Sequence, residues 1–408
     1  MKKPKKNFWE ERSRMSNTPK LRFPEFKGEW EEKKLSDFMT RLTRKNSNNE
    51  SSRALTISSV DGLIDQGEFF KKQIASKDTS GYYLLKNGDF AYNKSYSVGY
   101  DYGSIKRLDR YEDGVVSTLY ICMTLTSDTN SDYLTHYFDS MKWNKSVSEI
   151  SAEGARNHGL LNIPTESFFQ TKHFLAPSLA EQQKIAEFLS NVDSIITAET
   201  KILNTLQKKK KALMQKLFTR QLRFKSDDGT DFPAWEEKKL GECVEILDSQ
   251  RKPIESKERA NRKGEYPYYG ASGIIDYIDD YLFEGESILL GEDGANIINR
   301  NSRLAFIATG KYWVNNHAHI MKVNADNLNH FICEYLESLD YSKICAGSAQ
   351  PKLTQDVIRN LTIKAPCKEE QQKIADCLSS LDSLIQTQQK VVTTWQQRKK
   401  ALLQQMFI

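Results

Sequence analysis

The stretch that decides the fold is Ala176–Phe218, which reads APSLAEQQKIAEFLSNVDSIITAETKILNTLQKKKKALMQKLF. A second copy occupies Ala365–Phe407 and reads APCKEEQQKIADCLSSLDSLIQTQQKVVTTWQQRKKALLQQMF. The copies are offset by 189 residues without a gap, and 22 of the 43 aligned positions are identical. A repeat of this length at a fixed offset indicates two copies of one structural unit.

Both copies have the periodicity of a long helix. Apolar residues recur at alternating steps of four and three, which is the heptad spacing along which two helices pack. The heptad is interrupted at matching polar positions, Glu199 with Gln388 and Lys210 with Lys399, and such residues fix register and partner. We therefore expect two long helices packed on each other rather than ordinary helices of a globular core. The apolar heptad positions are Ile185, Leu189, Val192, Ile196, Leu203, Leu206, Leu213 and Leu217, then Ile374, Leu378, Leu381, Ile385, Val392, Trp395, Leu402 and Met406.

A second, shorter repeat precedes the variable part of each half. The hexapeptide WEEKKL occurs at Trp30–Leu35 and again at Trp235–Leu240. Leu-Arg-Phe stands before each copy, at Leu21–Phe23 and Leu222–Phe224. Between WEEKKL and the following helix, a stretch that we call the body, the two halves share little sequence. Constant surroundings with divergent contents suggest two related modules that act on different targets.

The positions of these motifs also predict how the chain closes. Leu222–Phe224 follows the end of the first helix, whereas Leu21–Phe23 lies at the other end of the chain from the second helix. If the helices lie antiparallel, Leu21–Phe23 can complete the second module. The chain would then form a closed pseudo-twofold arrangement of body, helix, body and helix.

Composition limits the class of protein. The 408 residues allow two or three domains, and 38% apolar with 28% charged residues is typical of a soluble folded chain. No apolar run approaches the roughly 20 residues of a membrane span. The net charge of +5 permits nucleic-acid binding but does not by itself indicate it. The cysteines lack CxxC spacing, so we interpret them as reduced thiols of a cytoplasmic protein without a zinc site: Cys122, Cys243, Cys333, Cys345, Cys367 and Cys377.

The two bodies are predicted to be mixed in secondary structure. Phe90–Tyr92 and Ser287–Leu290 follow similar turns and are predicted strands, whereas Tyr133–Lys145 and Phe331–Leu339 are predicted helices. Neither body has the regular βαβ alternation of a nucleotide-binding sheet. The predicted fold class is therefore α+β: two globular mixed α/β domains joined by two long antiparallel helices in a coiled coil, with an internal pseudo-twofold repeat.

The sequence contains no recognisable catalytic motif. It lacks the phosphate-binding loop and the Gly-x-Gly-x-x-Gly fingerprint, and Glu292 with Asp293 in Gly291–Gly294 would repel phosphate. These two carboxylates are adjacent, so in a strand they would point to opposite faces. We interpret His317 and His319 as structural, because no carboxylate completes them as a metal site. No catalytic residue and no metal ligand is predicted.

Several loops instead have the composition of nucleic-acid contacts. Tyrosines cluster there with basic and amide side chains, the residue types that contact phosphates and base edges. Each of these residues alone fits an ordinary polar surface loop better than a DNA contact, and it is the set that favours DNA binding. The predicted DNA-binding residues are Lys94, Tyr96, Tyr100, Tyr102, Arg156, Asn157, Tyr268, Tyr269, Asn296, Arg300, Arg303, Gln350 and Lys352.

The chain resembles the specificity subunits of type I restriction-modification systems, the HsdS family. The resemblance rests on the duplicated P-x-x-x-EQQKIA-x-x-L-S-x-x-D helices from Pro177 and Pro366, on the doubled LRF…WEEKKL motifs, and on the run between Tyr266 and Ala295. It implies a DNA-binding protein without catalytic activity, in which each target recognition domain reads one half of a bipartite site. The two helices would set the distance between the half-sites.

The resemblance also implies partners. Two methyltransferase subunits would dock on the helices, and restriction subunits would join the full complex. S-adenosylmethionine, ATP and Mg are then expected on those subunits, and no cofactor on this chain. The implied partner-binding residues are Glu181, Gln182, Ile185, Leu189, Glu370, Gln371, Ile374 and Leu378.

Domain limits follow from the two repeats. Residues 1–19 are predicted to be a disordered N-terminal extension, since 1–14 lack apolar periodicity and Met15 begins a stretch more typical of a natural start. Two alternative functions stay open at this point: a coiled-coil scaffold that never touches DNA, and a self-contained methyltransferase. The predicted domains are 20–175 and 222–364 for target recognition, with spacer helices at 176–221 and 365–408.

Overall fold

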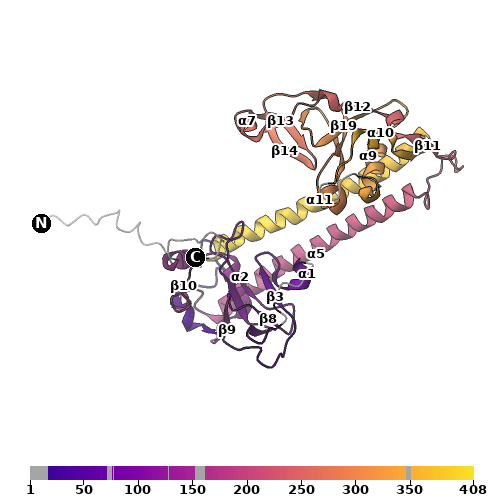
Figure 1. The fold of residues 1–408 in the computed structure, drawn as a ribbon. Helices are drawn as coiled ribbons and strands as arrows, with labels where there is room; N and C mark the ends of the chain where they lie inside the picture. Colours follow the sequence, from indigo (N-terminus) through magenta and orange to yellow (C-terminus); the bar gives the residue numbers. More distant parts are fainter. Residues whose placement is uncertain (1–16, 71–75, 77, 127, 152–160, 346–350) are drawn as a thin grey trace. The chain divides into compact units, whose positions relative to one another are not determined.

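The computed structural model describes residues 17–70, 76, 78–126, 128–151, 161–345 and 351–408. The chain folds into two compact units: unit 1 comprises Met1–Glu199 with Val391–Ile408, and unit 2 comprises Thr200–Lys390. Both predicted long helices are present, as α5 (Leu179–Phe218) and α11 (Lys368–Met406) (Figure 1). Each helix contributes one part to each unit, so the two units do not coincide with the four predicted domains.

The long helices run antiparallel, as predicted. In unit 1 the beginning of α5 shares a core with the end of α11, through Ile185 and Leu189 on one helix and Leu403 and Met406 on the other. In unit 2 the end of α5 shares a core with the beginning of α11. Every apolar heptad position is buried or partly buried. The heptad period therefore identified the packed face of both helices.

Unit 1 is built on a four-stranded antiparallel sheet of order β2-β9-β6-β7. Strand β1 pairs separately with β10 beside the start of α5, and β3 pairs with β4 and β5 with β8. The strands are β1 (Glu31–Lys34), β2 (Met39–Arg41), β3 (Leu55–Ser58), β4 (Gly62–Asp65), β5 (Tyr83–Lys86), β6 (Phe90–Asn93), β7 (Ser104–Arg107), β8 (Asp113–Val116), β9 (Ile121–Leu125) and β10 (Lys172–Leu175). The helices of the body are η1 (Leu35–Asp37), α1 (Gln66–Phe70), α2 (Ser131–Asp139), α3 (Asn144–Ile150) and α4 (Thr165–Phe169).

Unit 2 contains a matching sheet of order β12-β19-β16-β17 and a second sheet of order β14-β13-β18-β15. The strands are β11 (Glu236–Lys239), β12 (Val244–Ile246), β13 (Lys263–Gly270), β14 (Gly273–Ile278), β15 (Phe283–Glu284), β16 (Ser287–Gly291), β17 (Ala305–Ala308), β18 (Lys311–Val314), β19 (Ala318–Val323) and β20 (Thr362–Ala365). The helices of the body are α6 (Leu240–Cys243), η2 (Asp248–Gln250), α7 (Ser256–Ala260), α8 (Asn296–Asn299), α9 (Asn329–Ser338), η3 (Tyr341–Lys343) and α10 (Gln355–Asn360).

The glutamate of the repeated EQQKIA motif attaches each body to its helix. Glu181 is 1% exposed and accepts hydrogen bonds from Arg22 Nε at 2.6 Å and from Trp30 Nε1 at 3.2 Å. Glu370 is 0% exposed and accepts from Arg223 Nε at 3.1 Å and Trp235 Nε1 at 3.1 Å. The LRF and WEEKKL motifs thus supply the partners of the helix motif. This explains why all three occur together twice.

The following glutamine makes the next set of contacts. Gln182 donates from Nε2 to the carbonyl of Ala176 at 2.8 Å and accepts at Oε1 from the backbone N–H of Asn130 at 2.8 Å. Gln371 does the same with Pro366 at 3.0 Å and Leu328 at 3.1 Å. A buried amide satisfied on both sides fixes the start of a helix against the neighbouring helix of the body.

The lysines that interrupt the heptads form ion pairs between the two long helices. Lys399 Nζ lies 2.6 Å from Asp193 in unit 1, and Lys210 Nζ lies 2.7 Å from Asp382 in unit 2. Asp193 and Asp382 are separated by the same 189 residues as Lys210 and Lys399, so one pair repeats the other. These pairs form only in one antiparallel register, and the polar interruptions therefore specify it.

The N-terminal segment completes the end of α11, as the repeat predicted. Leu21 N–H donates to the carbonyl of Gln405 at 2.9 Å, whereas Leu222 N–H donates to that of Lys216 at 3.1 Å. Asn17, within the predicted extension, accepts a 2.7 Å hydrogen bond from the backbone of Trp30. Residues 1–16 of that extension lie outside the described residues.

We expect Glu370→Gln to lower the free energy of unfolding of unit 2 by roughly 2–3 kcal/mol, because it leaves the Arg223 guanidinium without its counter-charge. This is less than for a fully buried pair, since the Arg223 side chain is 30% exposed. Chemical denaturation followed by circular dichroism measures the change. The exposed neighbour Glu369→Gln is the control, and equal effects of both substitutions would contradict the role given to Glu370.

Candidate nucleic-acid interface

Part of the predicted DNA-binding set lies on equivalent hairpins of the two bodies. The loop from β6 to β7 carries Lys94, Tyr96 and Tyr100, and the loop from β16 to β17 carries Asn296 and Arg300. The equivalence follows from the register, since Phe90 of β6 lies opposite Met123 and Ile288 of β16 lies opposite Met321. Composition alone therefore located the same structural element in two dissimilar sequences.

In each unit a second chain segment is hydrogen-bonded to the β6–β7 or β16–β17 loop. Other predicted DNA-binding residues lie in or next to these segments. In unit 1 the N–H of Leu161 donates to the carbonyl of Lys94 at 3.0 Å. In unit 2 Gly294 donates to Pro351 at 3.1 Å and Leu353 donates to Glu292 at 2.8 Å. These contacts place Lys352 beside the β16–β17 loop. Arg156, Asn157 and Gln350 lie outside the described residues, and their assignment stays a prediction.

In unit 1 the side chains of the β6–β7 loop differ in solvent exposure. Tyr96 is 55% exposed and nearby Val98 is 90% exposed, so both side chains face solvent. Tyr100 lies with its ring centroid 6.0 Å from the Lys106 ammonium. Tyr102 packs on the core, and its carbonyl accepts a 2.7 Å hydrogen bond from Tyr92. Burial lowers the pKa of Lys94.

Tyr268 corrects the prediction for unit 2. Its side chain is 0% exposed and its hydroxyl accepts a 2.9 Å hydrogen bond from the backbone of Ile254, so it belongs to the core. Tyr269 is partly buried, with its ring centroid 5.8 Å from those of Phe306 and Tyr312. Tyrosines in a strand alternate between faces, and the sequence could not tell which faces were covered.

Other predicted residues of unit 2 have partners within their own unit. Arg300 lies 2.9 Å from Glu337, and Arg303 pairs with Glu334 and lies 3.4 Å from Asp382. Arg303 therefore links the body to α11, whereas Arg300 pairs with α9 within the body. Asn296 closes the β16–β17 loop, donating to the carbonyl of Ser302 at 3.2 Å and accepting from its N–H at 3.0 Å.

His319 has two carboxylate neighbours, so the prediction that no carboxylate completes this site is wrong. Asp248 Oδ2 lies 2.6 Å from Nδ1 of His319, and Glu292 Oε2 lies 3.9 Å from it. Asp248 comes from η2, 71 residues earlier in the chain. Because Asp248 is so far from His319 in the sequence, local patterns could not predict that the two side chains meet. Asp248, Glu292 and His319 each offer one donor atom, and these atoms lie within 4.8 Å of one another, a spacing that suits a metal ion.

The surrounding charges favour an ion-pair network over a metal site. Arg251 Nη1 lies 2.7 Å from Glu292 Oε2, and Lys352 Nζ lies 3.1 Å from Oε1. Nε2 of His319 donates to the carbonyl of Leu353 at 2.8 Å, because a carbonyl oxygen can only accept. A metal ion would have to displace cations that already neutralise both carboxylates. The ion-pair network joins η2, the end of β16, β19 and the segment before α10.

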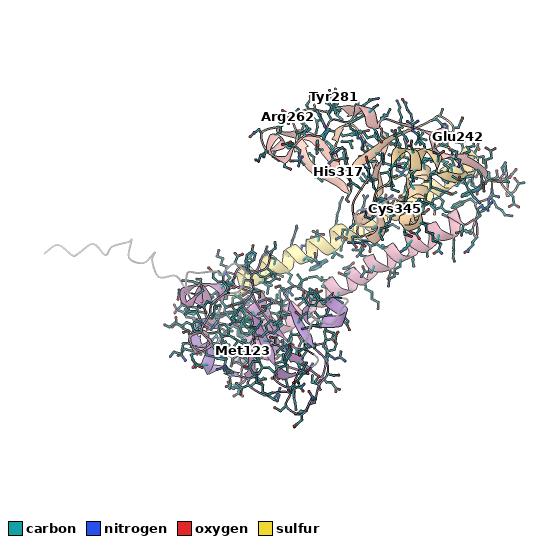
Figure 2. The ribbon with its side chains drawn as sticks, in the orientation of Figure 1. Met123, Glu242, Arg262, Tyr281, His317 and Cys345 are labelled. Atoms are coloured by element: carbon teal, nitrogen blue, oxygen red, sulfur yellow. The ribbon has the colours of Figure 1, made fainter. Side chains whose placement is uncertain are left out.

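The same contacts shift the ionisation of the carboxylates. Burial alone would raise the pKa of Asp248, but the hydrogen bond and charge of His319 and the nearby Arg251 hold this pKa below its ordinary value. Burial likewise opposes ionisation of Glu292, and Arg251, His319 and Lys352 lower its pKa. Both groups are therefore charged at neutral pH. His317, labelled in Figure 2, is more exposed and lies 2.9 Å from Asp293.

Comparison with known proteins agrees with this architecture. Residues 234–394 match the family described as "Type I restriction modification DNA specificity domain". The putative type I specificity subunit S.HindORF215P of Haemophilus influenzae is 35% identical over 36% of this chain and 37% of its own length. The MjaVIII specificity subunit of Methanocaldococcus jannaschii is 26% identical over 66% of this chain and 68% of its own length. The chain is thus similar to type I specificity subunits, with the family match confined to residues 234–394.

A solved specificity subunit has the same fold over nearly the whole chain. The S subunit of a type I restriction-modification system from M. genitalium covers 96% of this chain and 99% of its own, with a TM-score of 0.58 and 14% identity. At this identity the likeness concerns the fold alone. The alignment with the Haemophilus relative spans about a third of that protein. In the described part of the chain, no helix is both long and apolar enough to cross a membrane.

The residues predicted to bind partner subunits are all buried by their own chain. Glu181, Gln182, Glu370 and Gln371 contact the bodies, as described above, and the apolar members lie in the cores. The structure offers no free surface at these positions. The positions are Glu181, Gln182, Ile185, Leu189, Glu370, Gln371, Ile374 and Leu378.

Phe188 and Ile195 are exposed apolar residues that lie outside the heptad positions, so the heptad period did not identify them. A groove of about 430 Å³ lies on unit 1 between the first part of α5 and the last part of α11. Phe188, Ile195, Trp395 and Leu402 line it. The large side chains Phe188 and Trp395 stand where the other copy has Cys377 and Leu206, and this difference was visible in the aligned repeat.

Proposed function

We propose that this chain is the DNA sequence-specificity subunit of a type I restriction-modification complex. One observation carries the proposal: two units with matching sheets present dissimilar loops at equivalent positions. Loops on a constant scaffold are where recognition residues are expected, because they vary without disturbing the core. Each unit would read one half of a bipartite DNA site.

The long helices would connect the two recognition events. Each is a single element of about 40 residues that contributes to both units. A helix has a fixed rise of about 1.5 Å per residue, so its length would determine the number of base pairs between the half-sites. The ion pairs Lys399–Asp193 and Lys210–Asp382 support this role, since they oppose sliding of one helix along the other.

Methyltransferase subunits are the proposed protein partners. The groove lined by Phe188, Ile195, Trp395 and Leu402 has the exposed apolar character of a protein-docking surface. The chain itself would carry no catalytic site, and S-adenosylmethionine, ATP and Mg would belong to the methyltransferase and restriction subunits. The ion-pair network around His319 supports this division, since its cations already occupy the carboxylates.

DNA binding measured against salt concentration tests the proposal. The chain is assembled with its methyltransferase subunits, and a mobility-shift assay is run on duplexes that contain or lack the methylated motif of the host genome. We expect preference for the motif and a steep loss of affinity with salt, because phosphate contacts release counterions. No DNA binding, or a slope of affinity against salt near zero, would favour the scaffold alternative.

A further inference from the structure

Unit 1 has a position equivalent to the His319 network of unit 2, and the charge there is of opposite sign. Met39 of β2 lies opposite Leu125 of β9, as Val244 of β12 lies opposite Val323 of β19. In the same way, Tyr92 of β6 lies opposite Ile121 and Leu290 of β16 lies opposite His319. Ile121 therefore corresponds to His319, and Lys94 corresponds to Glu292. A cation therefore stands in unit 1 where unit 2 has a carboxylate.

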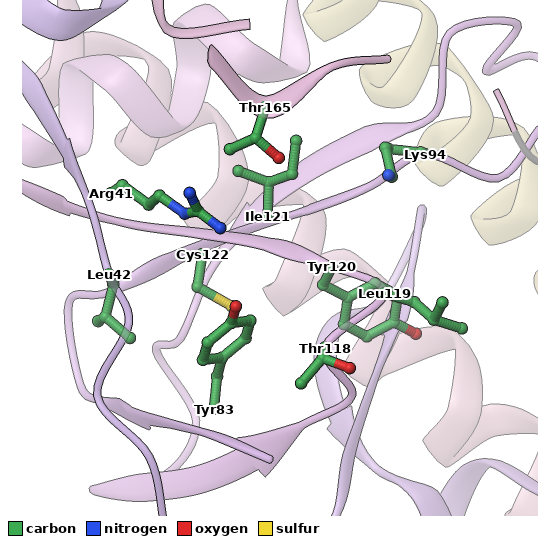
Figure 3. A pocket seen from close by; sticks show the side chains of 10 residues that line it. All are labelled: Arg41, Leu42, Tyr83, Lys94, Thr118, Leu119, Tyr120, Ile121, Cys122 and Thr165. Carbon is green, nitrogen blue, oxygen red and sulfur yellow. The ribbon is translucent and has the colours of Figure 1, made fainter. Parts of the chain in front are cut away.

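Unit 1 has a small polar pocket at this place. Its volume is about 50 Å³, several times the 10–15 Å³ that one ordered water needs. Arg41 lies on one side and Lys94 on the other, with Tyr83, Tyr120 and Thr165 among the side chains between them (Figure 3). The lining contains two cations and several hydroxyl groups, and none of its residues is acidic.

The charges of this pocket are less neutralised than those of the network in unit 2. Arg41 has one carboxylate close by, Glu166 at 3.5 Å, and the Glu166 side chain is 90% exposed. Among the residues that the structure describes, no carboxylate forms an ion pair with Lys94. Burial lowers the pKa of Lys94, because the partly desolvated ammonium lacks full hydration. An anion in the pocket would restore that lost stabilisation.

We propose that the pocket between Arg41 and Lys94 binds a phosphate group, which is a phosphodiester of the DNA backbone when DNA is bound. The assignment of this phosphate to DNA rests on the proposed function. Arginine and lysine with neighbouring hydroxyls are the side chains that contact phosphate oxygens in DNA complexes. The backbone of Lys94 is hydrogen-bonded to Leu161, and its loop carries the exposed Tyr96, so the pocket would position the β6–β7 loop on the duplex.

The test uses the complex with methyltransferase subunits and a duplex containing the methylated motif. Lys94→Gln and Arg41→Gln are each expected to weaken binding about equally on all sequences and to reduce the slope of log affinity against log salt by about one. The methylated motif is expected to stay the same. Lys94→Arg should keep the slope. Glu166→Gln, which removes the competing carboxylate, should tighten binding.

Controls separate this inference from the proposed function. Circular dichroism and thermal melting establish that each variant folds. An unchanged slope in both glutamine variants, with wild-type DNA binding intact, would overturn the pocket as a DNA phosphate site while leaving the proposed function in place. If the wild-type complex does not bind DNA, the proposed function fails and so does the assignment of the phosphate to DNA.

Inorganic phosphate distinguishes the source of the anion. The isolated chain is melted in phosphate and in chloride at equal ionic strength. Stabilisation by phosphate that Lys94→Gln abolishes supports an anion site, and together with an unchanged DNA slope it would assign the site to free phosphate. No difference between the two salts and no change in the slope would overturn the pocket as a phosphate site altogether.

Discussion

Removing one heptad from each long helix is expected to shorten the gap between the half-sites by about three base pairs and to leave both half-site sequences unchanged. Seven helical residues span about 10 Å, and DNA rises about 3.4 Å per base pair. A whole heptad keeps the packed face of each helix in phase. The methylation rate is expected to fall, because three base pairs also rotate the duplex by roughly a quarter turn.

The structure shows where this deletion should be made. Thr197–Leu203 and Gln386–Val392 are equivalent segments of the two helices, 189 residues apart. Both lie between the ion pairs Lys399–Asp193 and Lys210–Asp382, so the deletion preserves the contacts that set the register in each unit. Deleting from one helix only would leave the two helices unequal.

Sequencing of methylated adenines in cells that carry the deletion measures the result. A matched control removes five residues from the same two places, which rotates the packed face by roughly 140° at 3.6 residues per turn and is expected to abolish assembly and methylation. A heptad deletion that folds and methylates with an unchanged gap would show that the helices do not set the distance.

The sequence predicted the helices and their orientation because both depend on local and repeated patterns. A heptad period reports which face of a helix is packed, wherever the partner lies. The duplication of LRF, WEEKKL and EQQKIA also carried a signal that was not used: motifs that occur together twice are expected to contact each other. Arg22, Trp30 and Glu181 do so, as do Arg223, Trp235 and Glu370.

The candidate interface was predictable at the level of loops and much less so for single residues. Composition identified the β6–β7 and β16–β17 loops, but Tyr268 proved to be core and Arg303 an ion-pair partner of Glu334. The fate of a side chain depends on neighbours distant in sequence, such as Asp248 beside His319. The cationic pocket of unit 1 was not predictable from the sequence, because Arg41 and Lys94 are far apart in the chain and the two bodies share little sequence.

Exchanging residues 20–175 for the first body of another specificity subunit is expected to change one half of the methylated motif and to leave the other half and the gap unchanged. The physical reason is that the β6–β7 loop and its neighbouring segment belong to the exchanged body, whereas α5 and α11 stay. Sequencing of methylated adenines before and after the exchange measures both halves at once.

The contacts of Glu181 decide which donor bodies can be used. The incoming body must supply an arginine and a tryptophan at the places of Arg22 and Trp30, and a backbone N–H that Gln182 can accept at the place of Asn130. A donor with all three is expected to fold on the retained helices. The same donor with its arginine changed to alanine is the matched control and should lose stability without changing the motif. A change in both halves after exchange would mean that the two units do not read independently, and the modular mechanism would have to be abandoned.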